Sequence, residues 1–463
     1  MAQFTVQEQL MLELVNRARL DPRGEAARFG IDLNQGLPAG TLTATAKPVL
    51  AGNLLLVDAA RAHSQHMLDV DLFEHVGIGD GTPQTRMQNA GYVFTPPAAS
   101  GENIAVLGNS VVPNLTESVI AEHQGLFESE GHRKNLLDAD FRELGIGIKQ
   151  GTFLFTNEQG DPVNLNSVMT TQNFAFSGDQ VFITGVAIAD ADGDNFYDIG
   201  EQRAGISVTV KQAGNALDST TTATAGGYAL GLDAGSYVVE FSGGDLARAV
   251  NVTVTANANV KVDLAGASEI LASGNITLGA GAGSATLLGV APLKATGNAG
   301  NNQLLGNKGN NVLGGGDGND KLLGVAGHDT LNGGDGTDTL TGGSGRDTLT
   351  GGAARDIFDY NQSSESTAAS NGRDLIKDFL RGTDDIDLSG IDAITGGANN
   401  AFKFIGKAAF GGTAGELRFF FTNPAGTAND RTTVEGDVNG DRQADFRIDL
   451  AGLHNLTATD FIL

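Results

Sequence analysis

The sequence predicts a multidomain α+β protein whose C-terminal part contains a parallel β-roll. Glycines recur with a strict nine-residue period from Gly297 to Gly351. Residues 1–176 alternate amphipathic helical stretches with strand-like stretches, which predicts a mixed α/β domain. Residues 177–264 contain short alternating strands separated by turns, a pattern typical of a small β-sandwich. These three patterns predict three parts that fold differently.

Length and charge restrict the class of protein further. The chain has 463 residues, which favours several domains, and its net charge is −26. Acidic residues exceed basic ones in each of the three parts, so nucleic acid and anionic membranes are poor partners, and we expect no nucleic-acid binding. The chain has no cysteine, which excludes disulfides, zinc–thiolate sites and thiol catalysis. The carboxylates instead require cations.

Targeting signals are not evident at the start of the sequence. No apolar run reaches the ~20 residues of a transmembrane helix. The first residues lack the basic start, apolar core and small-residue cleavage site of a signal peptide. They predict an amphipathic helix with Leu10, Leu14 and Val15 on one face. We therefore expect no N-terminal signal peptide.

The N-terminal part continues with loops and further helices. Helices are predicted over 54–70 (LLLVDAARAHSQHMLDV) and 115–130, and strands around 152–155 and 168–176. Three phrases in this part resemble the bacterial branch of the CAP superfamily (cysteine-rich secretory, antigen 5 and pathogenesis-related 1 proteins). They are ARAHSQHM followed by LFEHVGIGDGTPQTRMQNAGY, then SGENIA, and then SEGHRKNLLDADFRELGIGI.

The CAP resemblance implies an α-β-α sandwich with a central cleft. It places His75, Glu102 and His132 at three of the four cleft positions that the family fills with two histidines and two acids. The nearest candidates for the second acid are Glu128 and Glu130.

The same residues allow several interpretations without the family. Two imidazoles and a carboxylate can hold Zn²⁺ with an open position, or can act as base and orienting group in hydrolysis. Alternatively, each is a hydrogen-bonded structural residue of the cleft. His63 and His66 lie three residues apart on a helix, and we expect them at the surface or behind the ligands.

The middle part contains a candidate calcium loop, DADGDNFYDIGE, between its first two strands. Asn195 stands where an EF-hand has glycine, and asparagine tolerates the left-handed turn. The surrounding sequence, GVAIADADGDNFYDIGEQRAGISVTV and AGGYALGLDAGSYVVEF, resembles the calcium-binding B-type repeats of bacterial surface adhesins, a prealbumin-like sandwich. The candidate ligands are Asp190, Asp192, Asp194, Phe196 through its carbonyl, Asp198 and Glu201.

The nine-residue repeat of residues 297–359 predicts a second set of calcium sites. A Gly-rich linker would not need a large apolar residue at the eighth position of each nine-residue unit, from Leu304 to Phe358. Two units make one turn, so each unit stacks on the next but one. The pattern resembles the RTX, or hemolysin-type, nonapeptide repeats, which implies a calcium-filled parallel β-roll. The candidate ligands are the third-position Asp317 and Asp335 and the sixth-position Asp320, Asp329, Asp338, Asp347 and Asp356.

The remaining residues flank the roll. Residues 265–296 are Gly/Ala-rich and are expected to form a linker. GRDLIKDFLRGTDDIDLSGID resembles the region after the repeats of serralysin-type proteins and would close the roll. A further acidic loop offers Asp437, Asn439, Asp441 and Asp445 as calcium ligands. The terminal DFIL resembles an uncleaved signal for type I secretion.

Together, these features predict an extracellular, calcium-stabilised protein that uses the type I secretion machinery. The predicted parts are 1–176 (CAP domain), 177–264 (β-sandwich), 265–296 (linker), 297–359 (β-roll) and 360–463 (roll-closing region with secretion signal). A binding role is favoured over an enzymatic one, with a divalent metal, lipid, polymer or cell-surface ligand in the cleft. A metal-dependent hydrolase and a structural or adhesive surface protein are the alternatives.

Overall fold

The computed structural model describes residues 3–157, 159–394, 396, 399–423, 426 and 428–463. It forms two compact units, Met1–Gly274 and Asn275–Leu463, which are considered separately below. Within the described residues, no helix combines the length and the apolar content needed to cross a bilayer.

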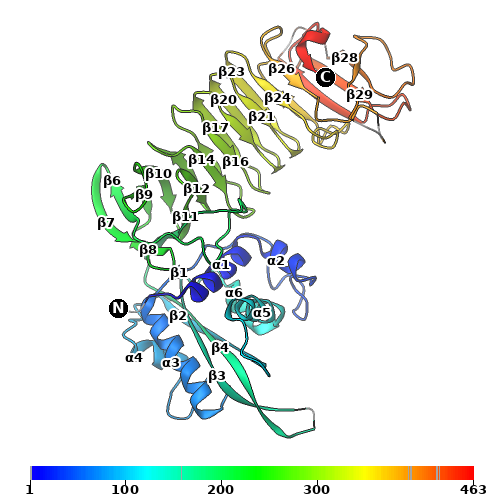
Figure 1. Cartoon of the computed structure of the whole chain (residues 1–463). Coiled ribbons are helices and arrows are strands. Elements are labelled where there is room, and N and C mark those ends of the chain that lie inside the picture. Colours follow the sequence, from blue (N-terminus) through cyan, green and yellow to red (C-terminus); the bar gives the residue numbers. More distant parts are fainter. Residues whose placement is uncertain (1–2, 158, 395, 397–398, 424–425, 427) are drawn as a thin grey trace. The chain divides into compact units, whose positions relative to one another are not determined.

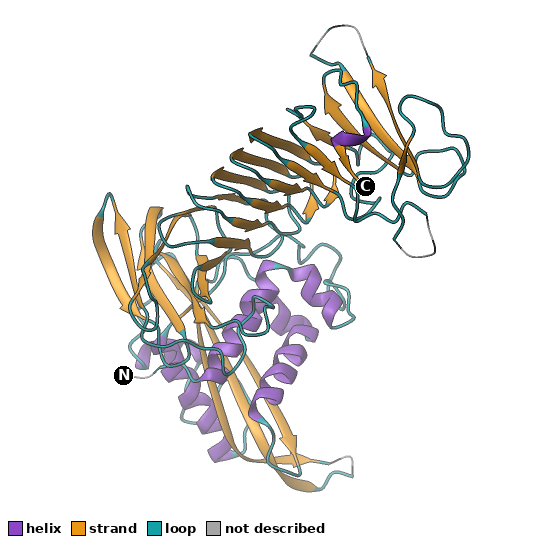
Figure 2. Cartoon of the chain, turned by 45° about the horizontal axis from the view of Figure 1, so that its top comes forward, coloured by secondary structure: helices purple, strands orange, loops and turns teal. Residues whose placement is uncertain are grey.

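The first unit begins with a four-stranded sheet covered by helices (Figures 1 and 2). Its strand order is β1-β3-β4-β2, with β1 parallel to β3 and the other pairs antiparallel. The strands are β1 (Ala51–Gly52), β2 (Ala98–Asn109), β3 (Glu143–Thr156) and β4 (Pro162–Ser177). The helices are α1 (Val6–Leu20), α2 (Pro22–Arg28), α3 (Leu54–Val70), α4 (Pro83–Asn89), α5 (Leu115–Glu128) and α6 (Glu130–Leu136).

Helices lie on both faces of this sheet. Neighbouring residues of a strand point to opposite faces. Thr171 of β4 bonds with Ser64 of α3, whereas the adjacent Thr170 donates to Glu122 of α5. Glycine permits the close approach of α3, since a Cβ on Gly145 would lie 2.1 Å from the backbone of Leu56. This arrangement is the α-β-α sandwich that the sequence implied.

The helices start where the local sequence offers capping groups. Thr5 and Glu8 form a capping box at α1, in which Oε2 of Glu8 accepts from the N–H of Thr5 at 2.8 Å. The side-chain oxygens of Asn53 and Asn114 accept main-chain N–H groups at the starts of α3 and α5. These caps satisfy N–H groups that a helix leaves unpaired.

The same unit continues into two sheets of short strands. Their orders within the unit are β10-β9-β6-β7 and β12-β11-β5-β8. Along β8, β9 and β10 buried and less buried residues alternate, as expected for half-buried strands. The strands are β5 (Val181–Ile188), β6 (Ser207–Gln212), β7 (Asn215–Thr221), β8 (Gly227–Leu232), β9 (Gly235–Ser242), β10 (Val250–Ala256), β11 (Val260–Ala265) and β12 (Glu269–Ala272).

Buried polar contacts join these two sheets to the helical part. Nζ of Lys261 lies 2.9 Å from Oε2 of Glu13 on α1. The side-chain amide of Asn259 donates to the carbonyls of Val49 and Arg142 at 2.9 and 2.6 Å. Residues of the predicted CAP domain and of the predicted sandwich therefore share one compact unit.

The second unit is built mainly of parallel ladders. In one ladder Leu304, Leu322, Leu340 and Phe358 align, and in the other Leu313, Leu331 and Leu349 align. All seven side chains are at most 2% exposed, and neighbours in each ladder are 18 residues apart. The expectation that each unit stacks on the next but one agrees with this register, and the predicted fold class is confirmed.

The parallel ladders begin earlier than the glycine repeats. The stretch 265–296, expected to be a linker, contains β12 to β15, and β15 pairs in parallel with both β13 and β17. The first strands of the ladders are β13 (Ile276–Leu278), β14 (Ser284–Leu287) and β15 (Lys294–Thr296). Apolar residues such as Leu278 and Leu287 are buried there without the glycine signature.

The repeats themselves supply the next strands. They are β16 (Gln303–Leu305), β17 (Val312–Asp317), β18 (Lys321–Leu323), β19 (Ala326–Gly327), β20 (Thr330–Asp335), β21 (Thr339–Thr341), β22 (Ser344–Gly345), β23 (Thr348–Ala353) and β24 (Ile357–Asp359). Figures 1 and 2 show these strands stacked in two layers.

The parallel ladders continue past the repeats and end beside a group of antiparallel strands. Here β25 pairs in parallel with β23, and β26 pairs in parallel with both β24 and β31, whereas β29 pairs antiparallel with β28 and β30. The strands are β25 (Asp374–Ile376), β26 (Asp385–Asp387), β27 (Lys403–Phe404), β28 (Glu416–Thr422), β29 (Arg431–Asp437), β30 (Phe446–Ala451) and β31 (Phe461–Ile462), with a short 3₁₀ helix at Ala458–Asp460.

Candidate functional sites

Sixth-position aspartates form two buried rows along the roll. The N–H of Asp320 donates to Oδ1 of Asp338 at 2.8 Å, and the N–H of Asp338 donates to Oδ1 of Asp356 at 2.9 Å. The other row joins Asp329 to Asp347 at 2.7 Å. One oxygen of each acceptor carboxylate is therefore used by the main chain 18 residues earlier.

The second oxygen of these carboxylates is buried and unpaired. Oδ2 has no hydrogen-bond partner among the described residues in Asp320, Asp329, Asp338, Asp347, Asp356 and Asp374. Burial raises the pKa of Asp320, Asp347 and Asp356 to about 6 each and that of Asp329 to about 7. A buried anionic oxygen without a donor is costly. A cation ligated by oxygen would remove this cost, so the residues fit calcium.

Glycine is required beside these oxygens. A Cβ on Gly315 would lie 2.1 Å from Oδ2 of Asp320 and 2.5 Å from the carbonyl oxygen of Gly333. The same arrangement recurs at Gly324, next to Asp329 and the carbonyl of Gly342. At Gly315, Gly324 and Gly333 the repeat thus brings a carboxylate oxygen and a carbonyl oxygen together, where a side chain would exclude both.

The predicted third-position ligands lie elsewhere. Asp317 and Asp335 align with each other on β17 and β20, but both are exposed. They therefore do not belong to the buried rows.

Two further aspartates continue the rows and were not singled out from the sequence. Asp374 accepts the N–H of Asp347 at 2.8 Å, and Asp384 accepts the N–H of Asp356 at 3.1 Å. Burial raises the pKa of Asp374 to about 9. A signal was present: each aspartate stands two residues before a buried apolar residue, Ile376 or Ile386, as in the repeats. A longer spacing of 27 or 28 residues concealed it.

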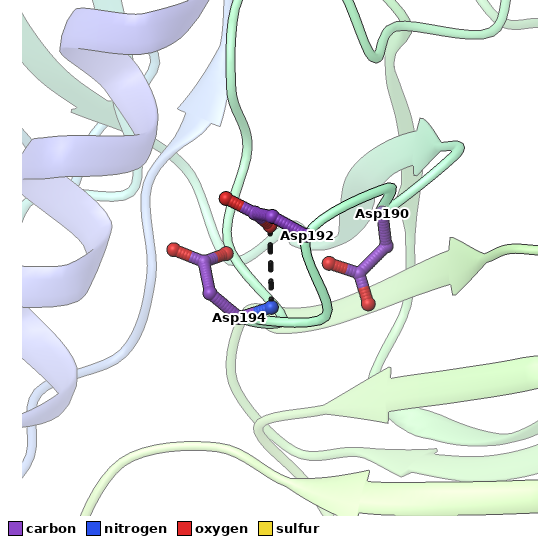
Figure 3. Close-up of side chains that lie close together, drawn as sticks. All are labelled: Asp190, Asp192 and Asp194. Atoms are coloured by element: carbon purple, nitrogen blue, oxygen red, sulfur yellow. Dashed lines mark hydrogen bonds between the residues drawn. The ribbon is translucent and has the colours of Figure 1, made fainter.

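The loop between β5 and β6 gathers the second set of acids. One ligand atom each from Asp190, Asp192 and Asp194 lies within 4.8 Å of the others (Figure 3), and the same holds for Asp192, Asp198 and Glu201. Burial is the main cause that raises the pKa of Asp198, and the neighbouring carboxylates add to it. The two groups share Asp192, so five of the predicted ligands lie close together.

The backbone of this loop explains how it closes. Asn195 adopts a left-handed conformation with φ of 60°, and its N–H donates to Oδ1 of Asp190 at 3.1 Å. Oε1 of Glu201 accepts the N–H of Ala191 at 2.6 Å, while its Oε2 is buried and has no hydrogen-bond partner in the described part of the chain. Phe196, the predicted carbonyl ligand, follows Asn195 directly.

The acidic loop between β29 and β30 is organised differently. Its carboxylates are occupied by the loop's own main chain: Asp437 accepts from Gly440 at 2.6 Å and from Arg442 at 2.9 Å, and Asp445 accepts from Val438 at 2.7 Å. The side-chain amide of Asn439 also donates to Asp445, at 2.9 Å. Among the described residues, Asp437, Asp441 and Asp445 do not converge as a group of three ligands.

The N-terminal cleft centres on Glu102 of β2. Nδ1 of His75 lies 2.9 Å from Oε1 of Glu102, and Nη2 of Arg86 lies 2.5 Å from its Oε2. Arg86 also donates to the carbonyls of His75 and Gly81. Glu102 and Arg86 are buried, whereas the His75 side chain is 49% exposed. A buried arginine therefore neutralises the cleft acid, which the sequence did not reveal.

His63 forms the wall behind Glu102. It is fully buried, its Nδ1 lies 2.5 Å from Oδ2 of Asp80, and its Nε2 lies 3.8 Å from Oε1 of Glu102. Of the two positions expected for His63, the one behind the cleft residues agrees with these contacts, and the one at the surface does not. Burial lowers the pKa of His63, which favours its neutral form.

His132 of α6 completes the predicted trio. Its pKa is lowered by burial and then by the nearby charge of His75. The side-chain amide of Asn103 donates to the carbonyl of His132 at 3.3 Å, and that of Asn135 donates to the carbonyl of Glu102 at 3.2 Å. This asparagine pair ties α6 to β2 and so positions His132.

Zinc is not favoured by this arrangement. Across the part of the chain that the structure describes, groups of three converging histidine or acid ligands occur only in the 190–201 loop. The candidate second acids Glu128 and Glu130 are both exposed. The buried acid of helix α5 is Glu122. Burial raises the pKa of Glu122 to about 8, and its carboxylate accepts a hydrogen bond from Thr170 at 2.5 Å.

Comparisons with known proteins find a matching family model for the N-terminal part and another for the C-terminal part. Residues 12–159 match the model of the cysteine-rich secretory protein family (CAP), and residues 295–463 match that of the peptidase M10 serralysin C terminal. The N-terminal part is thus a CAP domain, and the C-terminal part is a serralysin-type region with β-roll-like sheets.

Two curated proteins of Bacillus subtilis (strain 168) resemble the N-terminal part. The uncharacterized protein YkwD is 33% identical over 103 residues, which are 22% of this chain and 36% of that protein. The uncharacterized membrane protein YlbC is 33% identical over 91 residues, which are 20% of this chain and 23% of that protein. The chain thus covers only about a third and a quarter of these relatives.

Solved structures resemble each end of the chain over part of its length. An extracellular protein containing a SCP domain from Bacillus anthracis str. Ames is 26% identical, covers 38% of this chain and 44% of its own, and has a TM-score of 0.24. The AlgE6R3 subunit of the Azotobacter vinelandii mannuronan C5-epimerase is 23% identical, covers 37% of this chain and 78% of its own, and has a TM-score of 0.25.

Proposed function

We propose that this chain is a secreted calcium-binding protein in which the CAP domain binds a ligand and the β-roll drives folding after export. As part of this proposal, residues 1–176 bind the ligand and residues 177–264 form a calcium-bearing spacer that resembles adhesin B-type repeats. Residues 265–296, expected to be a linker, contain the first strands of the parallel ladders and so join the spacer to the roll. The RTX roll of 297–359 and the region of 360–463 form the folding and export module.

One observation carries the calcium proposal. Six stacked aspartates, from Asp320 to Asp374, each keep one buried carboxylate oxygen that receives no hydrogen bond from any residue the structure describes. Burial raises the pKa of all six, so the folded roll disfavours their charged forms when no cation is present. Calcium at extracellular concentration would reverse this preference, whereas calcium in the cytosol is too dilute for weak sites.

The serralysin-type match supports export by the type I secretion machinery. It extends to the last residue of the sequence, where DFIL stands. Export of an unfolded chain followed by calcium-induced folding would place the active form outside the cell.

The cleft supports binding more than hydrolysis. Both oxygens of Glu102 are held, by His75 and by the buried guanidinium of Arg86. A carboxylate whose two oxygens are already bonded to protein groups is poorly placed to take a proton from a substrate or water. The exposed ring of His75 and the half-buried His132 are available to a lipid, polymer or cell-surface ligand.

Native mass spectrometry with metal analysis tests this proposal on the full chain from a calcium-containing medium. We expect several calcium ions, lost in chelator, and a small molecule or none in the cleft. Asp338→Asn should reduce the number of bound calcium ions, whereas Asp218→Asn, on exposed β7, should not. Stoichiometric zinc with hydrolytic turnover would instead support the metal-dependent hydrolase, and a chain without calcium would refute the proposal.

A further inference from the structure

Three arginines line a pocket in the otherwise acidic second unit. The pocket has a volume of about 610 Å³ and lies beside the hairpin β29–β30. Its wall includes Phe410, Arg418, Glu435, Arg442, Gln443 and Arg447. Glu435 is the only acid among the lining residues, so the wall carries an excess of positive charge.

Two of the arginines are fixed by one buried carboxylate. Arg418, Glu435 and Arg447 are direct cross-strand neighbours on β28, β29 and β30. Nε of Arg418 donates to Oε1 of Glu435 at 2.6 Å, and Nε of Arg447 donates to Oε2 at 2.7 Å. The Glu435 side chain is only 3% exposed. Two positive charges therefore share one negative charge in a rigid sheet.

The Nη atoms of the two guanidinium groups have different surroundings. Because each Nε is bonded to Glu435, the Nη atoms remain for other partners. Nη1 of Arg418 donates to the carbonyl of Ala408 at 3.2 Å, and its guanidinium lies 5.1 Å from the ring centroid of Phe410. The Arg447 side chain is 33% exposed, and in the described residues no acceptor bonds its Nη atoms.

Arg442 adds a third charge from the rim. It lies on the loop between β29 and β30, is exposed, and donates from Nε to the carbonyl of Gly411 at 3.3 Å. Three further acids lie on the same sheet face, two positions along the strands, and each has partners of its own. Asp449 accepts from Thr433 at 2.7 Å and pairs with Arg373 at 3.4 Å, Glu416 accepts the N–H of Gly411 at 2.6 Å, and Asp437 accepts the N–H of Arg442 at 2.9 Å. None of these three acids is among the residues that line the pocket.

We propose that this pocket binds a small molecule bearing a carboxylate or sulfate group, held by Arg447 and Arg442. The planar fork of a guanidinium matches the oxygens of either group, which a lysine would not. The volume exceeds that of a bare anion and suits a molecule the size of one sugar ring. Phe410 and Gln443 offer it an apolar face and an amide.

Ligand-observed saturation-transfer NMR on the calcium-loaded full chain tests this site. The probes are D-glucuronate, which carries a carboxylate, and glucose, which has the same ring without the charge. We expect saturable binding of glucuronate only, with inorganic sulfate as a competitor. Displacement by sulfate means that the anion suffices, whereas failure to displace means that a carboxylate on a ring is required.

Two variants assign the binding to this pocket. Arg447→Gln and Arg442→Gly should each weaken glucuronate binding roughly tenfold, the usual effect of losing a charged hydrogen bond. Arg442 has φ of 70°, so glycine fits its backbone, and its Nε donates to the carbonyl of Gly411, whereas the Nε of Arg447 donates to Glu435. Arg442→Gly therefore remains informative if Arg447→Gln fails to fold.

Arg346→Gln is the matched control. This residue is exposed on the roll, loses the same charge and lies outside the pocket. Its binding should equal that of the unaltered chain. Equal binding of glucose and glucuronate, or unchanged binding in both pocket variants, would overturn the proposal. The three arginines would then serve only to stabilise the sheet.

Discussion

The guanidinium of Arg17 lies over the ring of Phe196, 5.0 Å from its centroid. Arg17 belongs to α1 of the CAP domain, where Glu25 also holds it at 2.7 Å. Phe196 belongs to the acidic loop of residues 190–201 and is its predicted carbonyl ligand. The proposed calcium loop therefore contacts the first helix of the ligand-binding part, and such cation–π contacts typically contribute ~0.5–2 kcal/mol.

Because of this contact, we expect that calcium bound in the loop slows the hydrogen exchange of α1. Asp192→Asn combined with Asp198→Asn should remove the ion and loosen Phe196. Hydrogen exchange of peptides from α1 should slow on adding calcium to the unaltered chain and should not slow in the double variant. Asp218→Asn serves as the control. Exchange in α1 that is equal with and without calcium would disprove the coupling.

The second prediction concerns calcium-dependent folding of the roll. In chelator the second unit should lose β-structure, and millimolar calcium should restore it. Asp338→Ala should raise the calcium midpoint roughly tenfold, because Asp338 accepts the N–H of Asp320 and has a buried unpaired oxygen. Circular dichroism of the full chain measures this midpoint.

Asp317→Ala provides the comparison for that measurement. Asp317 is an acid of the same repeat but is exposed. We expect a smaller shift of the midpoint than for Asp338→Ala. An equal shift would mean that the exposed third position contributes as much as the buried row.

The third prediction is that acid partly replaces calcium. Burial raises the pKa of Asp320, Asp347 and Asp356 to about 6 and that of Asp329 to about 7, above the ~3.9 of an unfolded chain. The folded roll without ions therefore binds protons more tightly than the unfolded chain. The contribution of these four carboxylates to the stability of the ion-free roll is fully present below pH ~4 and is lost as pH rises through 6 to 7.

In chelator, lowering the pH from 7.5 to 5 should thus increase the β-structure of the roll. With saturating calcium the signal should change little over this range, since the carboxylates stay charged and coordinated. The lower limit avoids the sequence pI of about 4.5, where the chain would aggregate. A roll that unfolds further on acidification in chelator would contradict the prediction.

The fourth prediction concerns the buried ion pair of the cleft. Glu102→Gln removes one of the two carboxylates that pair with Arg86, because Asp80 also lies 3.3 Å from its Nη1. The expected loss of stability is therefore smaller than the roughly 3–5 kcal/mol of a buried charge left without any partner. Chemical denaturation of the first unit should show this loss. Glu74→Gln, the same change at an exposed neighbour, should cost far less. Equal effects would show that the Arg86 pair is not important for stability.

The same cleft should not retain zinc. Calorimetric titration of the calcium-loaded chain with zinc should give no tight site that depends on His75 and His132. If the unaltered chain binds one zinc ion tightly and His75→Ala with His132→Ala abolishes it, the binding interpretation of the cleft must be replaced by a metal-dependent one.

The fifth prediction concerns export. Deleting residues 404–463 should keep the chain inside cells that carry a type I exporter. Because Phe461 aligns with Ile386 of β26, this deletion also exposes an edge of the roll. Asp460→Asn keeps every strand residue but alters a buried carboxylate that accepts the N–H groups of Thr457 and Gly382, so its folding has to be measured by circular dichroism beside its secretion. Unimpaired secretion of the truncated chain would locate the signal elsewhere.

The sequence by itself determined the periodic features of this protein. A glycine every ninth residue and a leucine two residues after each aspartate predicted the roll, its stacking register and the rows of carboxylates, because a repeat places equivalent residues at equivalent points. The phrases around His75, Glu102 and His132 similarly identified the CAP domain. These inferences depend on repeats and short motifs, and a single sequence contains all the residues that make up such local patterns.

Only the tertiary structure decided which partners meet across long separations. Arg86 lies 16 residues from Glu102 and no pattern links them, yet the fold buries them together and makes the cleft acid part of an ion pair. Asp374 and Asp384 join the rows through longer loops, and Arg17 reaches Phe196 from another part of the chain. Such contacts depend on how elements pack, because a side chain's charge is set by its neighbours in space and not by its neighbours in sequence.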